Sequence, residues 1–97
     1  MRQVIDGKIY DTDKAVLITI YQFNTNGDMN WVREELYRTP NGRFFLYGNG
    51  GRMTEYAEKN GAVTKLVTLT EADVIAWAER RAVDPNPLTK YIRIKEA

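Results

Sequence analysis

The stretch that most constrains the fold is 31–51, WVREELYRTPNGRFFLYGNGG, in which two aromatic-rich runs flank one turn sequence. Residues 39–43 have the composition of a type I turn with Gly42 in a left-handed bulge position. Such a turn fixes the register of a β-hairpin over about residues 30–48. The predicted pairs are Thr39 with Arg43, Tyr37 with Phe45, Glu35 with Tyr47, Leu36 with Leu46, and Arg38 with Phe44. The glycine-rich run at 48–52 is expected to break the second strand.

Side chains alternate between the two faces of a strand, so this register sorts the hairpin residues into two sets. The apolar set is expected to face the core and contains Val32, Leu36, Phe44 and Leu46, with Glu34 and Arg38 near its rim. The second set is aromatic and cationic and contains Trp31, Arg33, Tyr37, Arg43, Phe45 and Tyr47. Two interpretations of this second set are open: a buried layer under a helix, and a surface that contacts a partner or stacks nucleobases.

Side chains that commonly carry catalysis are scarce. The 97-residue chain has no histidine, no cysteine and no serine, which removes the usual nucleophiles, proton shuttles and zinc ligands. Glu34 and Glu35 point to opposite faces of a strand, so they cannot form the facing carboxylate pair of a glycosidase. Pairing with Arg38 or Arg43 is their expected role. We therefore expect no enzyme, no cofactor and no metal.

Asp11 and Asp13 stand at alternate positions, as calcium ligands do, but the segment lacks the further ligands that such a site needs. A turn or helix cap is the expected role for both residues. The run Gly48-x-Gly50-Gly51 could form a backbone nest for an anion. It lacks the full dinucleotide or P-loop spacing, so a strand-terminating loop is the plainer interpretation.

Shorter patterns surround the central hairpin. Residues 4–10 predict a second tight hairpin around Asp6 and Gly7. The run 15–23 is ambiguous between helix and strand, and its β-branched residues favour strand. We expect a short helical turn over 53–59 and a strand over 63–69.

One amphipathic helix is expected over about 70–82, where Thr70 and Asp73 resemble a capping box. Arg81 falls within the apolar stripe that includes Trp77, so its stem should lie on the core and its head in water. After the breaker at 84–87, residues 88–95 suggest a final strand. The chain is thus predicted to be a single α+β domain over 1–97, with a small, mainly antiparallel sheet packed against one principal helix.

Charge and hydropathy narrow the class of protein. The chain has 14 basic and 13 acidic residues, a net charge of +1, which gives no general attraction to nucleic acid or to an anionic membrane. No run of about 18 apolar residues is present, so we expect no membrane span. The absence of cysteine fits a reducing cytoplasm.

The aromatic and cationic set, together with the glycine-rich run, supplies the candidate contacts to a partner. Arginine is more frequent there than a buried layer normally accepts, and aromatic and arginine side chains dominate the energetics of many interfaces. The candidate partner-binding residues are Arg33, Tyr37, Arg43, Tyr47, Asn49 and Arg52.

Several strings resemble a family of short uncharacterised proteins from bacterial genomes and their prophages. They are VIDGKIYDTD at 4–13, ELYRTPNGRFFLYGNGG at 35–51, Tyr-Ala at 56–57 and LTEADVIAWAE at 69–79. The resemblance ends near Ala82. By size and genomic context it implies a phage or mobile-element accessory protein similar to anti-CRISPR and other anti-defence inhibitors. Such a protein would bind a host defence complex, a CRISPR effector for example, and block a protein surface. The alternative is a small nucleic-acid-binding module that uses the aromatic and arginine face of the hairpin.

Overall fold

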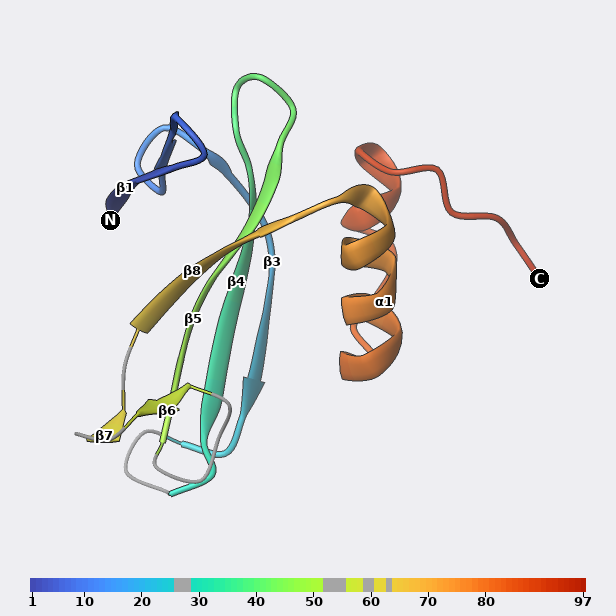
Figure 1. Ribbon diagram of the computed structural model, residues 1–97. Coiled ribbons are helices and arrows are strands. Elements are labelled where there is room, and N and C mark those ends of the chain that lie inside the picture. The colour runs from blue at the N-terminus through green and yellow to red at the C-terminus, as the bar shows by residue number, and fades with distance from the viewer. Residues whose placement is uncertain (26–28, 52–55, 59–60, 63) are drawn as a thin grey trace.

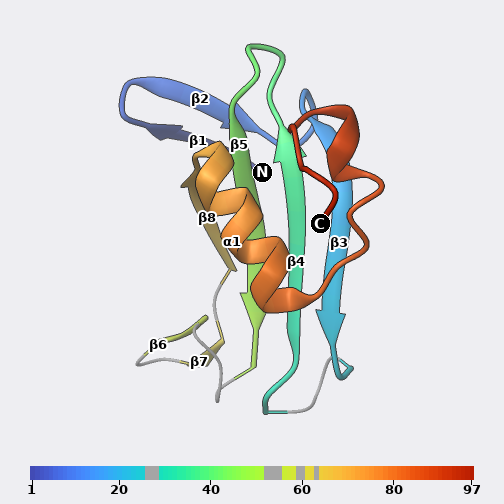
Figure 2. The ribbon, with the colours of Figure 1, turned by 90° about the vertical axis from the view of Figure 1, so that its right-hand side faces the viewer.

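The computed structural model describes every residue except 26–28, 52–55, 59–60 and 63. Its centre is a four-stranded antiparallel sheet with the strand order β3-β4-β5-β8 (Figure 1). These strands are β3 (Val16–Phe23), β4 (Val32–Arg38), β5 (Phe44–Gly50) and β8 (Thr64–Leu69). Helix α1 (Glu71–Arg81) lies across one face of the sheet (Figure 2). The α+β fold expected from the sequence is confirmed.

The β4–β5 hairpin has the register that its turn sequence predicts. Tyr37 pairs with Phe45, Leu36 with Leu46, Glu35 with Tyr47 and Arg38 with Phe44. In the turn, Gly42 has φ = 86°, and its N–H donates to the Thr39 carbonyl at 2.9 Å. Because most residues are strained at such a φ, the glycine allows the strands to reverse within three residues.

The glycine-rich run does not break β5, contrary to expectation. Gly48, Asn49 and Gly50 continue the strand and pair with Glu34, Arg33 and Val32, respectively. The expected strand-terminating loop is therefore wrong over 48–50, and the backbone amides of these residues serve the sheet.

Two short hairpins flank the sheet. β1 (Arg2–Ile5) pairs with β2 (Lys8–Asp11) through the predicted turn, in which Asp6 and Gly7 have φ values of 52° and 72°. β6 (Ala57–Glu58) pairs with β7 (Gly61–Ala62). The helical turn expected over 53–59 is wrong in its described part, because Ala57 and Glu58 are in a strand. Residues 53–55, 59 and 63 lie outside the described residues.

The ambiguous run 15–23 forms strand β3, as favoured. Its pairing with β4 contains a bulge between Leu17 and Thr19. Because one extra residue is accommodated there, Leu17 and Ile20 project on the same face of the sheet. Among the described strands, β3 lies at the edge of the sheet and pairs with β4 alone.

Helix α1 begins and ends as its sequence predicts. The Asp73 N–H donates to the Thr70 hydroxyl at 3.1 Å, and the Thr70 N–H donates to the Asp73 carboxylate at 2.9 Å. These bonds lower the pKa of Asp73. Ala82 closes the helix with φ = 52°. The buried face of α1 packs on the sheet in the main core, which contains Leu36, Phe44, Leu46, Val74, Trp77, Leu88 and Ile92.

The final strand expected over 88–95 is wrong. The chain instead forms a single 3-10 turn, η1 (Leu88–Lys90), preceded by Pro87. Leu88 and Ile92 are both buried in the main core. Their spacing of four residues places both on one side of a helical turn. The same residues also fit the two-residue alternation of a strand over 88–95, and the strand was the structure predicted.

Candidate partner-binding surface

The face of the sheet under α1 holds one buried carboxylate. Glu34 is only 1% exposed, and three donors reach it from distant parts of the chain. Trp77 Nε1 and Arg81 Nε each donate to its Oε1 at 2.8 Å, and the Tyr56 hydroxyl donates to Oε2. The Arg81 guanidinium also lies over the Tyr21 ring, 4.7 Å from its centroid. We call these five residues the Glu34 cluster.

The Glu34 cluster corrects two expectations. Glu34 does not lie at a rim with Arg38 or Arg43, and the Arg81 head group is not in water. Arg81 follows Trp77 by four residues, so the helix places both side chains one turn apart on the same face, above Glu34. A buried carboxylate needs such partners, because burying a charge without them is costly.

The surroundings of Glu34 favour its ionised form. Burial alone would raise its pKa, but the hydrogen bonds from Arg81, Tyr56 and Trp77 and the charge of Arg81 outweigh burial, so the pKa lies below the ordinary 4.5. The unfolded chain then takes up this proton at higher pH than the folded chain does. The stabilisation is therefore present above pH 4.5 and is lost as the pH falls through the lower pKa of the folded state. The cluster therefore stabilises the fold by joining strand β4 to Tyr56 and to helix α1.

Gly48 leaves space for the Tyr56 side chain in the Glu34 cluster. It pairs with Glu34 across the hairpin, and a Cβ atom at Gly48 would overlap the Tyr56 hydroxyl and ring. Glycine at this position thus lets Tyr56 lie flat over β5 and reach Glu34. The glycine that suggested an anion-binding loop has a packing role.

The opposite face of the sheet is covered at one end. There the β1–β2 hairpin packs on a second, smaller core of Tyr10, Tyr37, Phe45 and Leu66. The rings of Tyr37 and Phe45 stack with centroids 5.1 Å apart, and Tyr10 meets Phe45 edge to face. Tyr37 is 9% exposed, so the expectation that it presents its ring on an open surface is wrong. The β1–β2 hairpin covers these aromatic residues. This contact was not predicted from the sequence, which suggested a helix as the cover.

The other end of this face carries a chain of polar contacts. Glu35 accepts from Arg33 Nε at 3.0 Å and from the Tyr37 hydroxyl at 2.6 Å. Arg33 Nη1 also donates to Gln22 Oε1 at 3.0 Å. Burial, followed by the hydrogen bond and charge of Glu35, raises the pKa of Tyr37 to about 12. These contacts hold the Arg33 head group in place while 39% of its side chain stays exposed.

Strand β3 borders this polar chain with apolar side chains. Leu17 is 45% exposed and Ile20 is 39% exposed. The register sets Ile20, Glu35 and Tyr47 in one row across the sheet, and Gln22, Arg33 and Asn49 in the next row. We define the β3 surface as six exposed or half-buried residues, which are Leu17, Ile20, Gln22, Arg33, Glu35 and Tyr47.

The six candidate residues from the sequence divide among several places. Arg33 and Tyr47 belong to the β3 surface, and Asn49 borders it with a buried Oδ1 atom that has no hydrogen-bond partner among the described residues. Arg43 is exposed at the far end of the hairpin, beside the β1–β2 hairpin. Arg52 lies outside the described residues.

The sequence analysis missed the contribution of β3 to this surface. The run Val16–Phe23 contains no charged residue and no proline. A strand in the middle of a sheet often has this composition, whereas an outer strand usually carries charges or proline that discourage pairing with another chain. The missing information was the position of the strand, because composition alone does not say that β3 lies at the edge.

Comparisons with known proteins do not indicate a function for this chain. The chain matches no protein-family model, and no curated protein or solved structure matches it significantly. Within the described part of the chain, no helix is long and apolar enough to cross a membrane. In the same part, no three acidic side chains gather as a metal site would require. The resemblance to short bacterial and prophage proteins stays a prediction.

Proposed function

We propose that this protein acts by binding another protein at the β3 surface. The observation that carries the proposal is the outer strand β3, an eight-residue strand without charge or proline whose apolar side chains Val16, Leu17, Ile20 and Phe23 are exposed. Natural sheets usually protect such an edge, since its free backbone groups and apolar side chains readily pair with another chain. A partner that packs along β3 would supply that protection.

The composition of the β3 surface is that of an interface. Leu17 and Ile20 form its apolar centre, and Arg33, Glu35 and Gln22 form a polar margin whose hydrogen bonds are already made. Protein interfaces typically combine an apolar centre with a polar margin and are enriched in arginine and tyrosine. Because Arg33 is held by two partners, little side-chain entropy is lost when another protein contacts it.

The narrower expectation, that the partner is a host defence complex of the CRISPR type, belongs to this proposal. It is supported by the resemblance to prophage proteins and by the balanced charge of the chain, which disfavours mimicry of DNA. The alternative of nucleobase stacking on the hairpin has less support. Of the aromatic residues on that face, Tyr37 and Phe45 are buried, so only the half-buried Trp31 and Tyr47 could stack on bases.

The test is affinity capture with matched variants. The tagged protein and a Leu17→Glu/Ile20→Glu variant would each be incubated with lysate from a CRISPR-bearing bacterium, and bound proteins would be identified by mass spectrometry. A Val4→Glu/Val67→Glu variant is the control, because it adds the same charge at exposed valines outside the β3 surface. Circular dichroism and thermal unfolding would verify that each variant is folded.

We expect a protein that the wild type and the control variant capture and the β3 variant does not. Capture should persist at about 0.5 M salt, because an apolar centre is insensitive to screening whereas phosphate contacts weaken steeply. Equal capture by a folded β3 variant would refute the assignment of the surface. Capture of nucleic acid in place of protein, lost at high salt, would favour the alternative function.

A further inference from the structure

A hollow lies at the turn end of the β4–β5 hairpin. It is a cleft of about 630 Å³ between the β1–β2 hairpin and the turn that joins β4 to β5. This volume lies within the usual range for sites that bind small molecules. Its walls are residues of the N-terminal hairpin and of the turn: Arg2, Gly7, Lys8, Ile9, Tyr10, Asp11, Lys14, Thr39, Pro40, Asn41 and Arg43.

The charge of this cleft is unlike that of the whole chain. Four cations line it, Arg2, Lys8, Lys14 and Arg43, against the single carboxylate of Asp11, whereas the chain as a whole carries a net charge of +1. A concave surface lined by one sign of charge concentrates the electric field and attracts counter-ions. The lining of this cleft therefore carries a local excess of positive charge.

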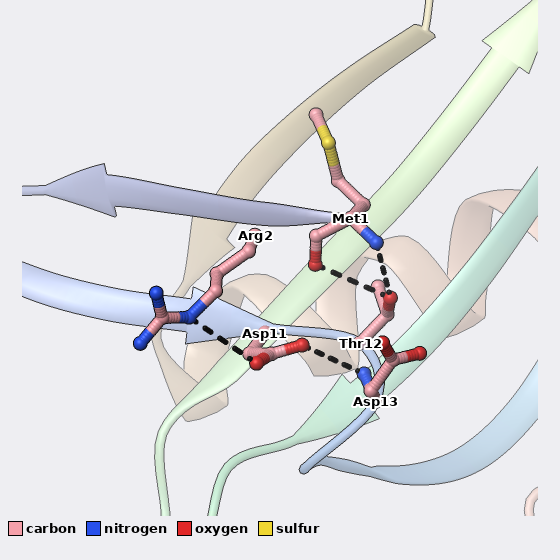
Figure 3. A network of polar contacts seen from close by, with 5 residues as sticks. All are labelled: Met1, Arg2, Asp11, Thr12 and Asp13. Carbon is pink, nitrogen blue, oxygen red and sulfur yellow. Dashed lines mark hydrogen bonds and ion pairs between the residues drawn. The ribbon is translucent and has the colours of Figure 1, made fainter.

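The one carboxylate is already engaged, as Figure 3 shows. Asp11 Oδ2 lies 3.4 Å from Arg2 Nε, and its Oδ1 accepts from the Asp13 N–H at 2.9 Å. Lys14 and Arg43, in contrast, form no side-chain hydrogen bond or ion pair with any described residue. The two cations are available to an anion in the cleft.

Both walls are fixed by hydrogen bonds. The Met1 amino group donates to the Thr12 hydroxyl at 3.0 Å, and the Thr12 hydroxyl donates to the Met1 carbonyl at 3.3 Å (Figure 3). The Thr12 N–H also donates to the Met1 carbonyl at 2.9 Å, and together these bonds secure the end of the β1–β2 hairpin. On the other wall, the Arg43 N–H donates to the Thr39 hydroxyl at 3.0 Å. The cations therefore stand on a preformed frame, and less ordering cost falls on binding.

We propose that this cleft binds the phosphate groups of a small phosphorylated molecule. Lys14 and Arg43 would contact the phosphate oxygens, since charge-assisted bonds of arginine and lysine are the common means of holding phosphate. Ile9, which is exposed, and Pro40 supply an apolar wall for the organic part of the ligand. The site is independent of the β3 surface, and its test does not depend on the protein partner.

A neighbouring hollow limits where the phosphate can lie. It adjoins the cleft at Lys8 and Arg43 and is lined by Asp6 and Asp73. Those carboxylates would repel an anion on that side. The phosphate is therefore placed between Arg43, at the boundary of the two hollows, and Lys14, which lines the cleft but not the second hollow.

The experiment is isothermal titration calorimetry with ATP, and with pyrophosphate as competitor, at two salt concentrations. The test variant is Lys14→Ala/Arg43→Ala. The control is Lys90→Ala/Lys95→Ala, which removes the same charge from exposed positions near the C-terminus. A single-stranded oligonucleotide is titrated in parallel, because it carries the same phosphate chemistry in polymeric form.

We expect ATP to bind and pyrophosphate to compete with it. The cleft variant should weaken binding by at least about tenfold, and the control variant by less than about twofold, because only the first removes direct contacts. The proposal is overturned if ATP does not bind, or if both variants weaken binding equally. An oligonucleotide that binds more than about tenfold tighter than ATP would also overturn it, because the phosphate would then come from nucleic acid.

Discussion

Glu34 and Glu35 are neighbours on β4, yet they lie on opposite faces of the sheet and differ in burial and in the origin of their hydrogen-bond donors. Glu34 is buried and receives donors from Tyr56, Trp77 and Arg81, which lie 22 to 47 residues away in the chain. Glu35 is partly exposed and is held by Arg33 and Tyr37, each two residues away. One carboxylate ties distant segments together, and the other orders a local surface.

The difference shows how one strand can contribute to a core on one face and, in the function we propose, to recognition on the other. Because side chains alternate, a strand between a covered and an open face places consecutive residues in different environments. On the covered face, Glu34 receives donors from Tyr56 and from helix α1 and is only 1% exposed. The open face keeps Arg33 and Tyr47 within reach of another molecule. We expect substitutions on the two faces to differ in the same way.

The largest effect is expected for Trp77→Ala. This change removes a large side chain from the main core and the indole N–H from Glu34, so it should lower the free energy of unfolding by about 3–5 kcal/mol. Urea denaturation followed by circular dichroism would measure it. An unfolding free energy within about 1 kcal/mol of the wild type would mean that the covered face is not the core described here.

Gly48→Ala should have the next largest effect. The added Cβ overlaps the Tyr56 ring, and displacing that ring would withdraw one donor from Glu34. Overpacking of this kind typically costs about 1–3 kcal/mol. The same denaturation experiment measures this loss. In a protein that already carries Tyr56→Ala, adding Gly48→Ala should lower the free energy of unfolding by less than it does in the wild type, because the overlapping ring is gone. Full additivity of the two changes would argue against their contact.

Tyr37→Phe probes the boundary between the covered and open ends of the second face. Losing the hydrogen bond to Glu35 should cost about 1 kcal/mol near neutral pH. Because the pKa of Tyr37 is raised from 10.0 to about 12, its contribution is complete below pH 10 and declines as the pH rises toward 12. Denaturation at a series of alkaline pH values should therefore show a steeper loss of stability in the wild type than in the variant. Parallel curves would contradict the raised pKa.

The smallest effect on stability is expected for Arg43→Ala/Tyr47→Ala. Arg43 is exposed and Tyr47 is half-buried, so the free energy of unfolding should change little, with the Arg43 change alone within about 0.5 kcal/mol. Binding of the captured protein partner should weaken by about 2 kcal/mol or more through the loss of Tyr47, which belongs to the β3 surface, as truncation of tyrosine at an interface often does. Titration with that partner would test it, and unchanged affinity in the folded variant would remove Tyr47 from the interface.

Local patterns predicted much of this fold. The turn at 39–43 specified the hairpin register pair by pair, and Thr70 with Asp73 marked the start of α1. The errors concern residues whose roles depend on distant segments. Gly48 was interpreted from its neighbours, whereas its role comes from Tyr56, and Arg81 was assigned to water although Glu34 lies beneath it.

The candidate site was predicted less completely for the same reason. Arginine and tyrosine content identified Arg33 and Tyr47, but exposure depends on what covers each end of the sheet. The β1–β2 hairpin buries Tyr37, and the outer position of β3 exposes Leu17 and Ile20. Neither fact follows from spacing within the hairpin, because both depend on tertiary packing.

The most direct test of the contrast between the two faces is a matched pair of isosteric variants, Glu34→Gln and Glu35→Gln. Each removes one negative charge from β4 at almost constant shape. We expect Glu34→Gln to lower the free energy of unfolding by about 2 kcal/mol or more, because Arg81 would be left beside a neutral group in a largely buried site. Glu35→Gln should cost less than about 1 kcal/mol, since its ion pair with Arg33 lies at a partly exposed surface. Equal losses for the two variants, or a larger loss for Glu35→Gln, would contradict the division of the sheet into a structural face and a binding face.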